Sequence, residues 1–428
     1  MPDIEAPFTR RRESSDRPRS VRKTSAVTAK LFEEIFGEPL SSVLDPQQWR
    51  AGYDVAREYA RIEREVQEAS QIETQVQAAI RAEILPRIVS SAANPIPGMG
   101  HHKIKVEEIR EIHNRLLFPG RVEAVDGTCT VHDTLPLTIY SLGVSLVSYH
   151  GDAGTWGMKL FRRDLRQKNE DPIAFAKKLL ERRDEREALN HESQRDDLTQ
   201  LARRALMTFA ERSVLVRQAT APWRIGHGNP CALELLAGGG CADLTIQSIR
   251  LLCDLVNHRK FVFVASEPKD RLALTIGEAL YPLEFVILGR LSERIEAQVE
   301  QVSLGREVTI DDTWDGIKLS PENWLRRFTE EYASKILHGV YRATSLSTAH
   351  VFYAHEDFFH EAARIAVADS ILQETRGFPL LIDLADQTCR SVYGGGGLSD
   401  MTEAAYARTG QPFRYHSERS TRSQRAEI

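Results

Sequence analysis

The sequence has few cysteines and no long apolar run. Its 428 residues include five cysteines, and none forms a Cys-x-x-Cys pair, so the usual pattern of a zinc site is missing. A sparse, odd set of cysteines suits a reducing compartment. No apolar run reaches the roughly 18 residues that span a bilayer, and the first residues lack the apolar core of a signal peptide. We therefore expect a cytoplasmic protein without a membrane segment.

Two common site motifs are also missing. The glycines at 238–240 are not followed by Lys and Ser or Thr, so they do not form a phosphate-binding P-loop. The sequence contains no Gly-x-Ser-x-Gly motif and no clear Ser/His/Asp arrangement. Neither nucleotide binding through a P-loop nor acyl transfer by a serine hydrolase is therefore indicated.

Basic residues gather at the two ends of the chain, although the net charge is -5. We expect residues 1–25 to be a disordered basic arm and residues 396–428 to hold a C-terminal helix and a basic tail. Such arms can contact phosphates, although solvated disorder is the more frequent explanation. The basic residues are Arg10, Arg11, Arg12, Arg17, Arg19, Arg22 and Lys23, then Arg414, Arg419, Arg422 and Arg425.

Residues 26–118 are predicted to form an N-terminal helical region. Between residues 46 and 89, apolar side chains recur every three or four positions, which indicates one long helix or a helical hairpin. Pro86, Pro95 and Pro97 end it. Two roles remain open for this region: an arm for dimerisation or for a partner, or a helix packed against its own core.

From residue 119 to residue 395 the pattern predicts an α/β domain. Three strands with short connections predict an antiparallel meander, and a helix follows between 171 and 218. Leu233–Leu236 is predicted as the fourth strand, and two helices close the domain. The three meander strands are Arg121–Thr130, Leu135–Tyr149 and Thr155–Phe161; later strands are 260–266, 283–288, 340–343 and 350–353; later helices are 243–257, 357–376 and 379–393.

Acidic residues follow this order of elements. Asp126 lies in the first strand, Glu211 in the next helix, Glu234 in the fourth strand, and Asp383 and Asp386 in the last helix. The order matches a ribonuclease H-like mixed sheet flanked by helices, in which the first and fourth strands are parallel neighbours. Converging carboxylates are ligands for Mg²⁺ or Mn²⁺, and two such ions can hydrolyse a phosphodiester. The alternative for Asp126-Gly127 is an ordinary hairpin turn.

The chain resembles the NurA nucleases, which act with a HerA-type hexameric ATPase in DNA end processing. The matching segments are Val125-Asp126-Gly127-Thr128, Glu211, LELLAGGG, FVFVASEP with LTIGEALYPLEFVILG, and RGFPLLIDLAD. They cover about residues 119–395. The resemblance implies a DNA nuclease dependent on Mn²⁺ or Mg²⁺, a homodimer, and a HerA-like translocase as partner.

The resemblance also implies catalytic, metal-holding roles. Asp126 matches the family's first catalytic aspartate, and Glu211 its helical glutamate. The family's fourth-strand Leu-Asp-Gly reads Leu-Ala-Gly here, with Ala237 at the aspartate, so Glu234 is the nearest substitute. A regular strand would place positions 234 and 237 on opposite faces, so Glu234 needs a bulge or an early strand end. Asp386 takes the place of the family's late histidine.

Each of these residues also has an ordinary structural explanation. Glu211 would be a surface glutamate paired with Arg204 or Arg212. Glu234 would be a strand-edge acid, and Asp383 a supporting or solvated residue. His227 either contacts phosphate or is structural. The alternative function is a catalytically degenerate NurA-like subunit that binds DNA or serves assembly, which Ala237 favours. A PD-(D/E)XK nuclease is disfavoured because no convincing Glu-x-Lys strand follows Asp126.

Overall fold

The computed structural model describes residues 28–49, 55–91, 96–134, 137–163, 173, 177, 204–266, 271–299 and 312–413. Its contacts divide the chain into residues 1–72 and residues 73–428, and each unit is described separately. The basic arm, the tail beyond residue 413 and most of the helix expected between 171 and 218 lie outside the described residues. Among the residues described, no helix has the length and apolar character to cross a membrane.

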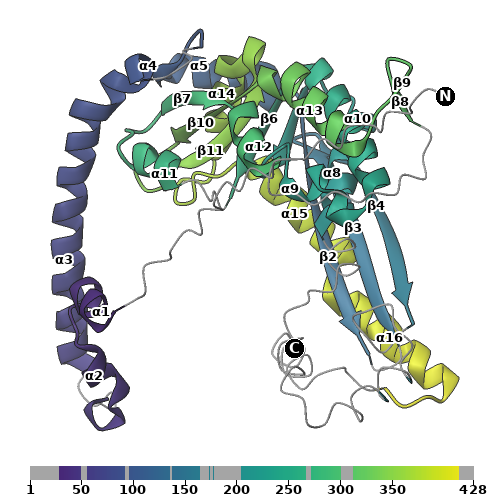
Figure 1. The fold of residues 1–428 in the computed structure, drawn as a ribbon, viewed down its shortest axis with the longest axis horizontal. Coiled ribbons are helices and arrows are strands. Elements are labelled where there is room, and N and C mark those ends of the chain that lie inside the picture. The colour runs from purple at the N-terminus through teal and green to yellow at the C-terminus, as the bar shows by residue number, and fades with distance from the viewer. Residues whose placement is uncertain are drawn as a thin grey trace, which may run out of the picture. The chain divides into compact units, whose positions relative to one another are not determined.

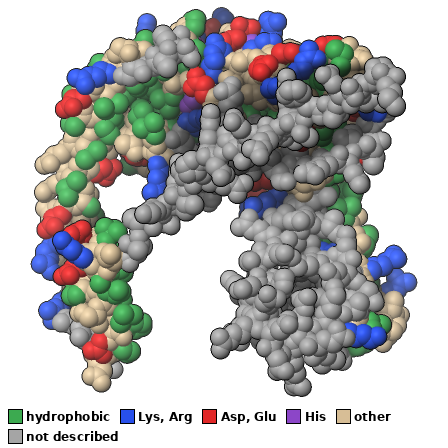
Figure 2. Space-filling view, viewed as in Figure 1, with side chains coloured by type: hydrophobic (Ala, Val, Ile, Leu, Met, Phe, Trp, Pro, Cys, Tyr) green, Lys and Arg blue, Asp and Glu red, His purple; other side chains and the backbone are tan. Residues whose placement is uncertain are grey.

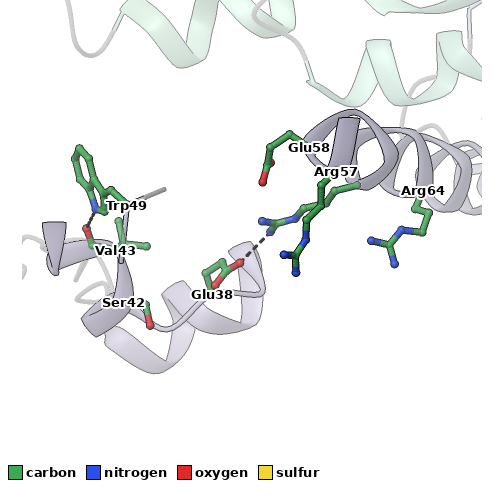
Figure 3. Close-up of a pocket in the computed structure, with 8 residues that line it drawn as sticks. Glu38, Ser42, Val43, Trp49, Arg57, Glu58 and Arg64 are labelled. Atoms are coloured by element: carbon green, nitrogen blue, oxygen red, sulfur yellow. Dashed lines mark hydrogen bonds and ion pairs between the residues drawn. The ribbon is translucent and has the colours of Figure 1, made fainter. Parts of the chain in front are cut away.

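The first unit consists of helices joined by polar contacts. Trp49 donates its indole N–H to the carbonyl of Val43 at 2.8 Å, and Arg61 pairs with Glu38 at 2.9 Å (Figure 3). The first contact closes the turn after α2, and the second joins the segment after α1 to the long helix α3. The elements are α1 (Ala29–Phe36), α2 (Leu40–Leu44), a 3-10 turn (Pro46–Gln48) and α3 (Val55–Ala79), which runs past the unit's end.

The apolar residues of α3 are exposed. Val55, Tyr59, Ile62 and Val66 recur every three or four residues, and each keeps more than half of its surface exposed, from 58% to 74%. Apolar side chains also show on this helix in Figure 2. No side chain in α1, α2 or α3 is buried. The described part of the first unit therefore provides no core for this face.

The second unit is built on one mixed sheet. Among the described residues it has nine strands in the order β1-β7-β10-β11-β6-β5-β2-β3-β4. The pairs β2–β5 and β5–β6 are parallel, and the other neighbours are antiparallel. The strands are β1 (Gly100–Lys103), β2 (Val122–Asp133), β3 (Thr138–Ser148), β4 (Gly151–Arg162), β5 (Trp223–His227), β6 (Phe261–Ala265), β7 (Glu284–Arg290), β10 (Ile336–Arg342) and β11 (His350–His355); β8 (Thr313–Trp314) and β9 (Ile317–Lys318) form a separate pair.

The predicted meander is confirmed, and β2 is longer than expected. Asp126 is paired with Ser145 and Gly127 with Val144, and the ladder continues to Asp133. The interpretation of Asp126-Gly127 as a hairpin turn is therefore wrong. The glycine is accommodated inside the strand because β3 supplies backbone partners on both sides of it. Figure 1 shows β2, β3 and β4 as three long arrows with α15 and α16 beside them.

The predicted fourth strand is wrong. Leu233–Leu236 forms the short helix α9, and the strand beside β2 is β5, formed by Trp223–His227. The apolar residues at 233, 235 and 236 look like a strand, but Leu235 and Leu236 are consecutive and both buried, as on a helix face. Trp223–His227 has only two apolar side chains, Trp223 and Ile225, and stands beside glycines in the sequence, which hid the strand.

The helical region predicted for residues 26–118 also contains a strand. β1 pairs with β7 at the edge of the sheet, so residues from about 100 onward belong to the α/β unit. The helices of this unit are α4 (Ile88–Ser91), α5 (Val106–Ile112), α8 (Leu206–Arg217), α9 (Leu233–Leu236), α10 (Ala242–His258), α11 (Arg271–Glu278), α12 (Ser292–Val299), α13 (Pro321–Glu331), α14 (Phe359–Ser370), α15 (Leu380–Tyr393) and α16 (Gly395–Thr409), with shorter turns at Ile80–Ile84, Leu85–Arg87, His113–Leu117, Gly238–Gly240, Ala333–Lys335 and Glu356–Phe358.

Helices cover both faces of the sheet and make two large cores and one smaller apolar cluster. Val122 and Ala124 of β2 pack in the cluster that contains α5, α14 and α15, whereas Val125 packs in the cluster that contains α8, α10 and α13. Successive side chains of a strand point to opposite faces. Asp126 therefore lies on the α15 face, and Gly127 lies on the α8 face.

Two glycines let α15 lie close to the long strands. Gly143 of β3 is paired with Gly157 of β4, and the Tyr393 ring covers both. A Cβ atom at Gly143 would lie 2.2 Å from this ring, and one at Gly157 would lie 2.3 Å from it. The close approach fixes the C-terminal end of α15 on the sheet.

We expect Gly143→Ala to lower the free energy of unfolding by about 1–3 kcal/mol, since the added methyl overpacks the contact with Tyr393. Urea denaturation followed by circular dichroism measures the change. Gly396→Ala is the matched control: its Cβ meets nothing within 4 Å in α16, so stability stays the same or rises by up to about 1 kcal/mol. Equal destabilisation by both substitutions would contradict this account of the glycine pair.

Candidate active site

The site lies where the parallel pairing of β2 with β5 ends. The paired residues run from Val122 with Trp223 to Val125 with Gly226, and β5 stops at His227 while β2 continues. Beyond this point the β5 side of β2 has no strand partner among the described residues. Asp126 is the first residue at this opening, so groups from both faces of the sheet can approach it.

The carboxylate of Asp126 is held in one orientation. The backbone N–H of Gly127 donates to Oδ1 at 2.9 Å, and Nδ1 of His227 lies 3.3 Å from the same oxygen. The residue is 6% exposed. Since both contacts fall on Oδ1, the second oxygen, Oδ2, is left without a hydrogen-bond donor among the described residues. It is the oxygen that can meet a ligand.

His227 was considered in the sequence as a phosphate contact or a structural residue, and the structure places it beside Asp126. A carboxylate only accepts hydrogen bonds, so Nδ1 donates to Asp126, and Nε2 accepts from the Ser266 hydroxyl at 2.8 Å. Burial by itself would lower the pKa of His227, but the hydrogen bond and charge of Asp126 outweigh burial and raise the pKa. The edge of the ring contacts Phe378 at 5.8 Å between centroids.

The structure corrects the expectation of no Ser/His/Asp arrangement. Asp126, His227 and Ser266 lie in line on three adjacent strands, β2, β5 and the end of β6. No sequence motif can reveal this alignment, because the three residues lie far apart in the chain and only sheet pairing brings them together. The two contacts fix the tautomer and the plane of the imidazole beside Asp126.

Glu211 approaches from the opposite face on α8. A Cβ at Gly127 would lie 1.8 Å from the end of Met207 and 3.0 Å from Oε1 of Glu211, so the glycine makes room for α8. The Glu211 side chain is 13% exposed. Burial raises the pKa of Glu211 to about 7, and the charge of Asp126 adds to this, although Arg212 opposes it. Glu211 is therefore not a surface glutamate, but the pairing with Arg212 that the sequence also allowed is present, at 2.9 Å.

Asp386 on α15 is the third carboxylate. Burial raises the pKa of Asp386, and the negative charge of Asp126 raises it further, which shows that the two residues are close enough to interact. Arg390 pairs with Asp386 at 2.8 Å from one turn further along the helix, and this arginine side chain is 69% exposed. Asp383 pairs instead with Arg376, in agreement with the supporting role considered for it.

The position of α15 depends on a buried aspartate that the sequence analysis did not single out. Asp369 of α14 is fully buried, accepts the backbone N–H of Leu381 at 3.0 Å, and accepts the hydroxyl of Tyr149. A carboxylate at the start of α15 satisfies an otherwise unpaired N–H and interacts favourably with the helix dipole. It thereby fixes the helix that carries Asp386. No local pattern marks this residue as a cap, because it caps a different helix.

Glu234 does not occupy the position predicted for it. It lies in the first turn of α9, not in a strand, and is half-buried. Ala237 follows α9 at its C-terminal end, so it is also outside the sheet. The residue that faces Asp126 from the fourth strand is His227. The substitution of Glu234 for a fourth-strand aspartate therefore loses its structural basis.

The carboxylates fit a hard divalent cation by their chemistry. Asp126, Glu211 and Asp386 supply oxygen ligands of the kind that Mg²⁺ and Mn²⁺ prefer. The pKa values of Glu211 and Asp386 are raised first by burial and then by the negative charge of Asp126. Within the described part of the chain, no three His, Cys, Asp or Glu side chains already lie close enough to hold a metal. Binding therefore requires these side chains to move closer together.

Comparisons with known proteins gave matches among solved structures. No family model matches the chain, and no curated protein matches its sequence. The NurA nuclease from Sulfolobus solfataricus is 10% identical, with 84% of this chain and 98% of that chain covered at a TM-score of 0.43. NurA with manganese is 9% identical, with coverage of 78% and 98% at 0.38. Endonuclease V of Ciona intestinalis, in complex with an inosine-containing DNA, is 15% identical, with coverage of 63% and 84% at 0.27.

The strand order itself defines the class of the fold. An antiparallel meander, β4-β3-β2, is followed by β5 and β6 in parallel beside β2, with helices on both faces. This is the ribonuclease H-like mixed sheet that was predicted. Among solved structures, the chain is similar to NurA nucleases.

Asp369 should make stability depend on pH in a defined direction. Burial raises the pKa of Asp369 from 3.8 to about 6. Between these values the folded protein keeps a proton that the unfolded chain has lost, so stability falls as pH rises from about 4 to about 6. The difference of about two pKa units corresponds to about 3 kcal/mol.

Urea unfolding of the wild type and of Asp369→Asn at several pH values measures this effect. As pH rises over this range, we expect the wild type to lose about 3 kcal/mol of stability relative to Asp369→Asn. Tyr149→Phe is a second control: it removes a hydrogen bond that lowers the pKa of Asp369, so the pH midpoint should move upward. A pH-independent difference would contradict the assignment of a buried proton.

Proposed function

We propose that this protein is a DNA nuclease that hydrolyses phosphodiester bonds with Mn²⁺ or Mg²⁺ and acts in DNA end processing. One observation carries the proposal: where the parallel β2–β5 pair ends, the charge of Asp126 acts on Glu211 from one face of the sheet and on Asp386 from the other. Three carboxylates from a strand, a helix on one face and a helix on the other form an arrangement that a divalent cation neutralises. The resemblance to the NurA nucleases supports the choice of DNA as substrate.

In this proposal Asp126, Glu211 and Asp386 hold the cation. The bound cation supplies a Lewis acid, which polarises a phosphodiester oxygen and lowers the pKa of water. His227 and the N–H of Gly127 orient Asp126 through Oδ1, so that Oδ2 faces the ligand. Asp369 positions α15, and Phe378 packs against the imidazole. The residues that hold these groups in place are therefore spread over both faces of the sheet.

The alternative is a catalytically degenerate subunit that binds DNA or serves assembly. A specific observation favours it: the residue beside Asp126 on β5 is His227, not a carboxylate. The cleavage experiment below distinguishes the two, because a binding module keeps its DNA affinity when Asp126 is changed and shows no metal-dependent cleavage in any form.

We expect the protein to degrade linear DNA with Mn²⁺ or Mg²⁺, and to stop when the metal is chelated. Asp126→Asn, Glu211→Gln and Asp386→Asn should each lower the cleavage rate at least about 100-fold, since each removes charge from the cation site. DNA affinity, measured by fluorescence anisotropy, should change less than the rate. The assay uses single- and double-stranded linear DNA with a fluorescent end label.

Asp254→Asn is the matched control for this series, because Asp254 is an exposed aspartate on α10, remote in the sequence from all three carboxylates. It should cleave as the wild type does. Glu234→Gln tests the sequence-based assignment: a loss of cleavage there would return Glu234 to the site. Cleavage that persists in all three carboxylate variants would refute the proposed site.

We further propose that the protein is a cytoplasmic homodimer that works with a HerA-type hexameric ATPase. The resemblance supports both partners, and the exposed apolar residues of α3 offer a surface for one of them. Light scattering coupled to size-exclusion chromatography should give a dimer mass for the chain alone. In a mixture, the chain should elute with the ATPase.

The substitutions Ile62→Glu and Val66→Glu together assign the α3 surface. They change exposed positions, so the fold should persist. Loss of co-elution with retention of the dimer would assign α3 to the ATPase, and a monomer mass would assign α3 to dimerisation. If the chain is monomeric and fails to bind the ATPase before any substitution, this part of the proposal is refuted.

A further inference from the structure

A buried arginine stands inside the carboxylate site. The side chain of Arg212 is 2% exposed and follows Glu211 directly on α8. One guanidinium nitrogen, Nη1, donates to Oε2 of Glu211 at 2.9 Å. The other, Nη2, donates to the backbone carbonyls of His227 at 2.8 Å and Asn229 at 3.1 Å. The guanidinium is thus surrounded by three oxygens, from α8 and from the end of β5.

These three oxygen atoms are of the kind that coordinate metal ions in proteins. A carboxylate and backbone carbonyls are hard ligands for Mg²⁺, Mn²⁺ or Ca²⁺. Here they face a fixed organic cation, because a guanidinium stays protonated and a buried charge requires partners. The charge of Asp126 acts on Arg212 as well. The position beside Glu211 on the β5 side is therefore already occupied by positive charge.

Residues of the neighbouring strands β5 and β6 fix the position of Arg212. The guanidinium lies over the ring of Phe263 on β6, 4.6 Å from the ring centroid. The ring in turn needs Gly226 on β5, because a Cβ there would lie 2.1 Å from it. An aromatic face stabilises a cation that is removed from water. Three elements, α8, β5 and β6, thus fix the arginine, and it cannot withdraw without leaving Glu211 and the two carbonyls unpaired.

Charge then limits the number of metal ions. The carboxylates of Asp126, Glu211 and Asp386 carry three negative charges when ionised, and Arg212 cancels one of them. The remaining two match one divalent ion. Arg390 does not enter this balance in the same way, because it meets Asp386 from solvent, where its charge is screened.

Resting on the proposed function, we propose that Arg212 takes the place of one of two cations, so that each chain holds a single divalent ion at Asp126, Glu211 and Asp386. The site then differs from a two-ion nuclease site, in which two metal ions flank the scissile phosphate. The arginine supplies a permanent positive charge on the side of Glu211 that faces β5. A metal ion would exchange with solvent only on the opposite side of Glu211, toward Asp126 and Asp386.

The test is the number of Mn²⁺ ions bound per folded chain. Free Mn²⁺ is followed by electron paramagnetic resonance during titration of the full-length protein, with and without a saturating nucleoside monophosphate as product mimic. We expect one ion per chain in the wild type and none at this site in Asp126→Asn. Anomalous diffraction at the manganese edge should show one peak near Asp126.

Substitution of the arginine gives the opposite result. Arg212→Met removes the charge with little change in size, and we expect two ions per chain. Arg212→Lys keeps the charge and should keep one ion. Arg390→Met is the matched control, since it removes a solvent-exposed arginine from Asp386 and should leave the count at one. If Arg212→Met does not fold, the counts for the wild type and Arg212→Lys still decide the question.

Each outcome has a separate meaning. Two ions in the wild type, both lost in Asp126→Asn, would overturn the single-ion inference and leave the nuclease proposal standing. One ion that persists in Asp126→Asn would place the metal elsewhere and overturn the inference. No bound ion, together with no cleavage of DNA, would overturn the proposed function itself.

Discussion

The parallel pairing of β2 with β5 is the constraint on which the site depends. It stops one residue before Asp126, so β2 continues with one open edge. A buried carboxylate at such an opening needs compensation, and the opening admits groups from both faces. His227 arrives from the adjacent strand, Glu211 and Arg212 from α8, and Asp386 from α15. If β5 were two residues longer, its pairing with β2 would extend past Asp126 and close this edge.

Small residues make this convergence possible. Gly127 lets α8 come close to β2, Gly143 and Gly157 let the end of α15 lie on the long strands, and Gly226 makes room for Phe263 beneath Arg212. None of these four has the positive φ that only glycine tolerates easily. Each is small because a neighbouring side chain occupies the space of its Cβ. The positions of the charged groups therefore depend on packing as much as on electrostatics.

Charge is distributed unevenly within the site. Glu211 and Asp386 both have raised pKa values, because burial and the negative charge of Asp126 act on them together. Arg212 balances part of this charge from inside the protein, whereas Arg390 balances part of it from solvent. Arg212 is buried and Arg390 is mostly exposed, so the two balancing charges differ in their access to solvent.

The sequence by itself determined the meander, most of the later elements, and the candidates Asp126, Glu211 and Asp386. These depend on local patterns: alternation in strands, helical periodicity, and acidic residues in a recognisable order. It failed for the fourth strand, for the placement of Glu234 in that strand, and for the alignment of His227 with Ser266. A pair of adjacent leucines fits a strand or a helix equally well, and only burial against α8 and α10 makes Leu233–Leu236 helical. Likewise, a histidine and an arginine in unremarkable segments acquire their positions only when the sheet pairs β5 with β2. Tertiary structure decided these because strand pairing joins residues about a hundred positions apart, and no local pattern contains that information.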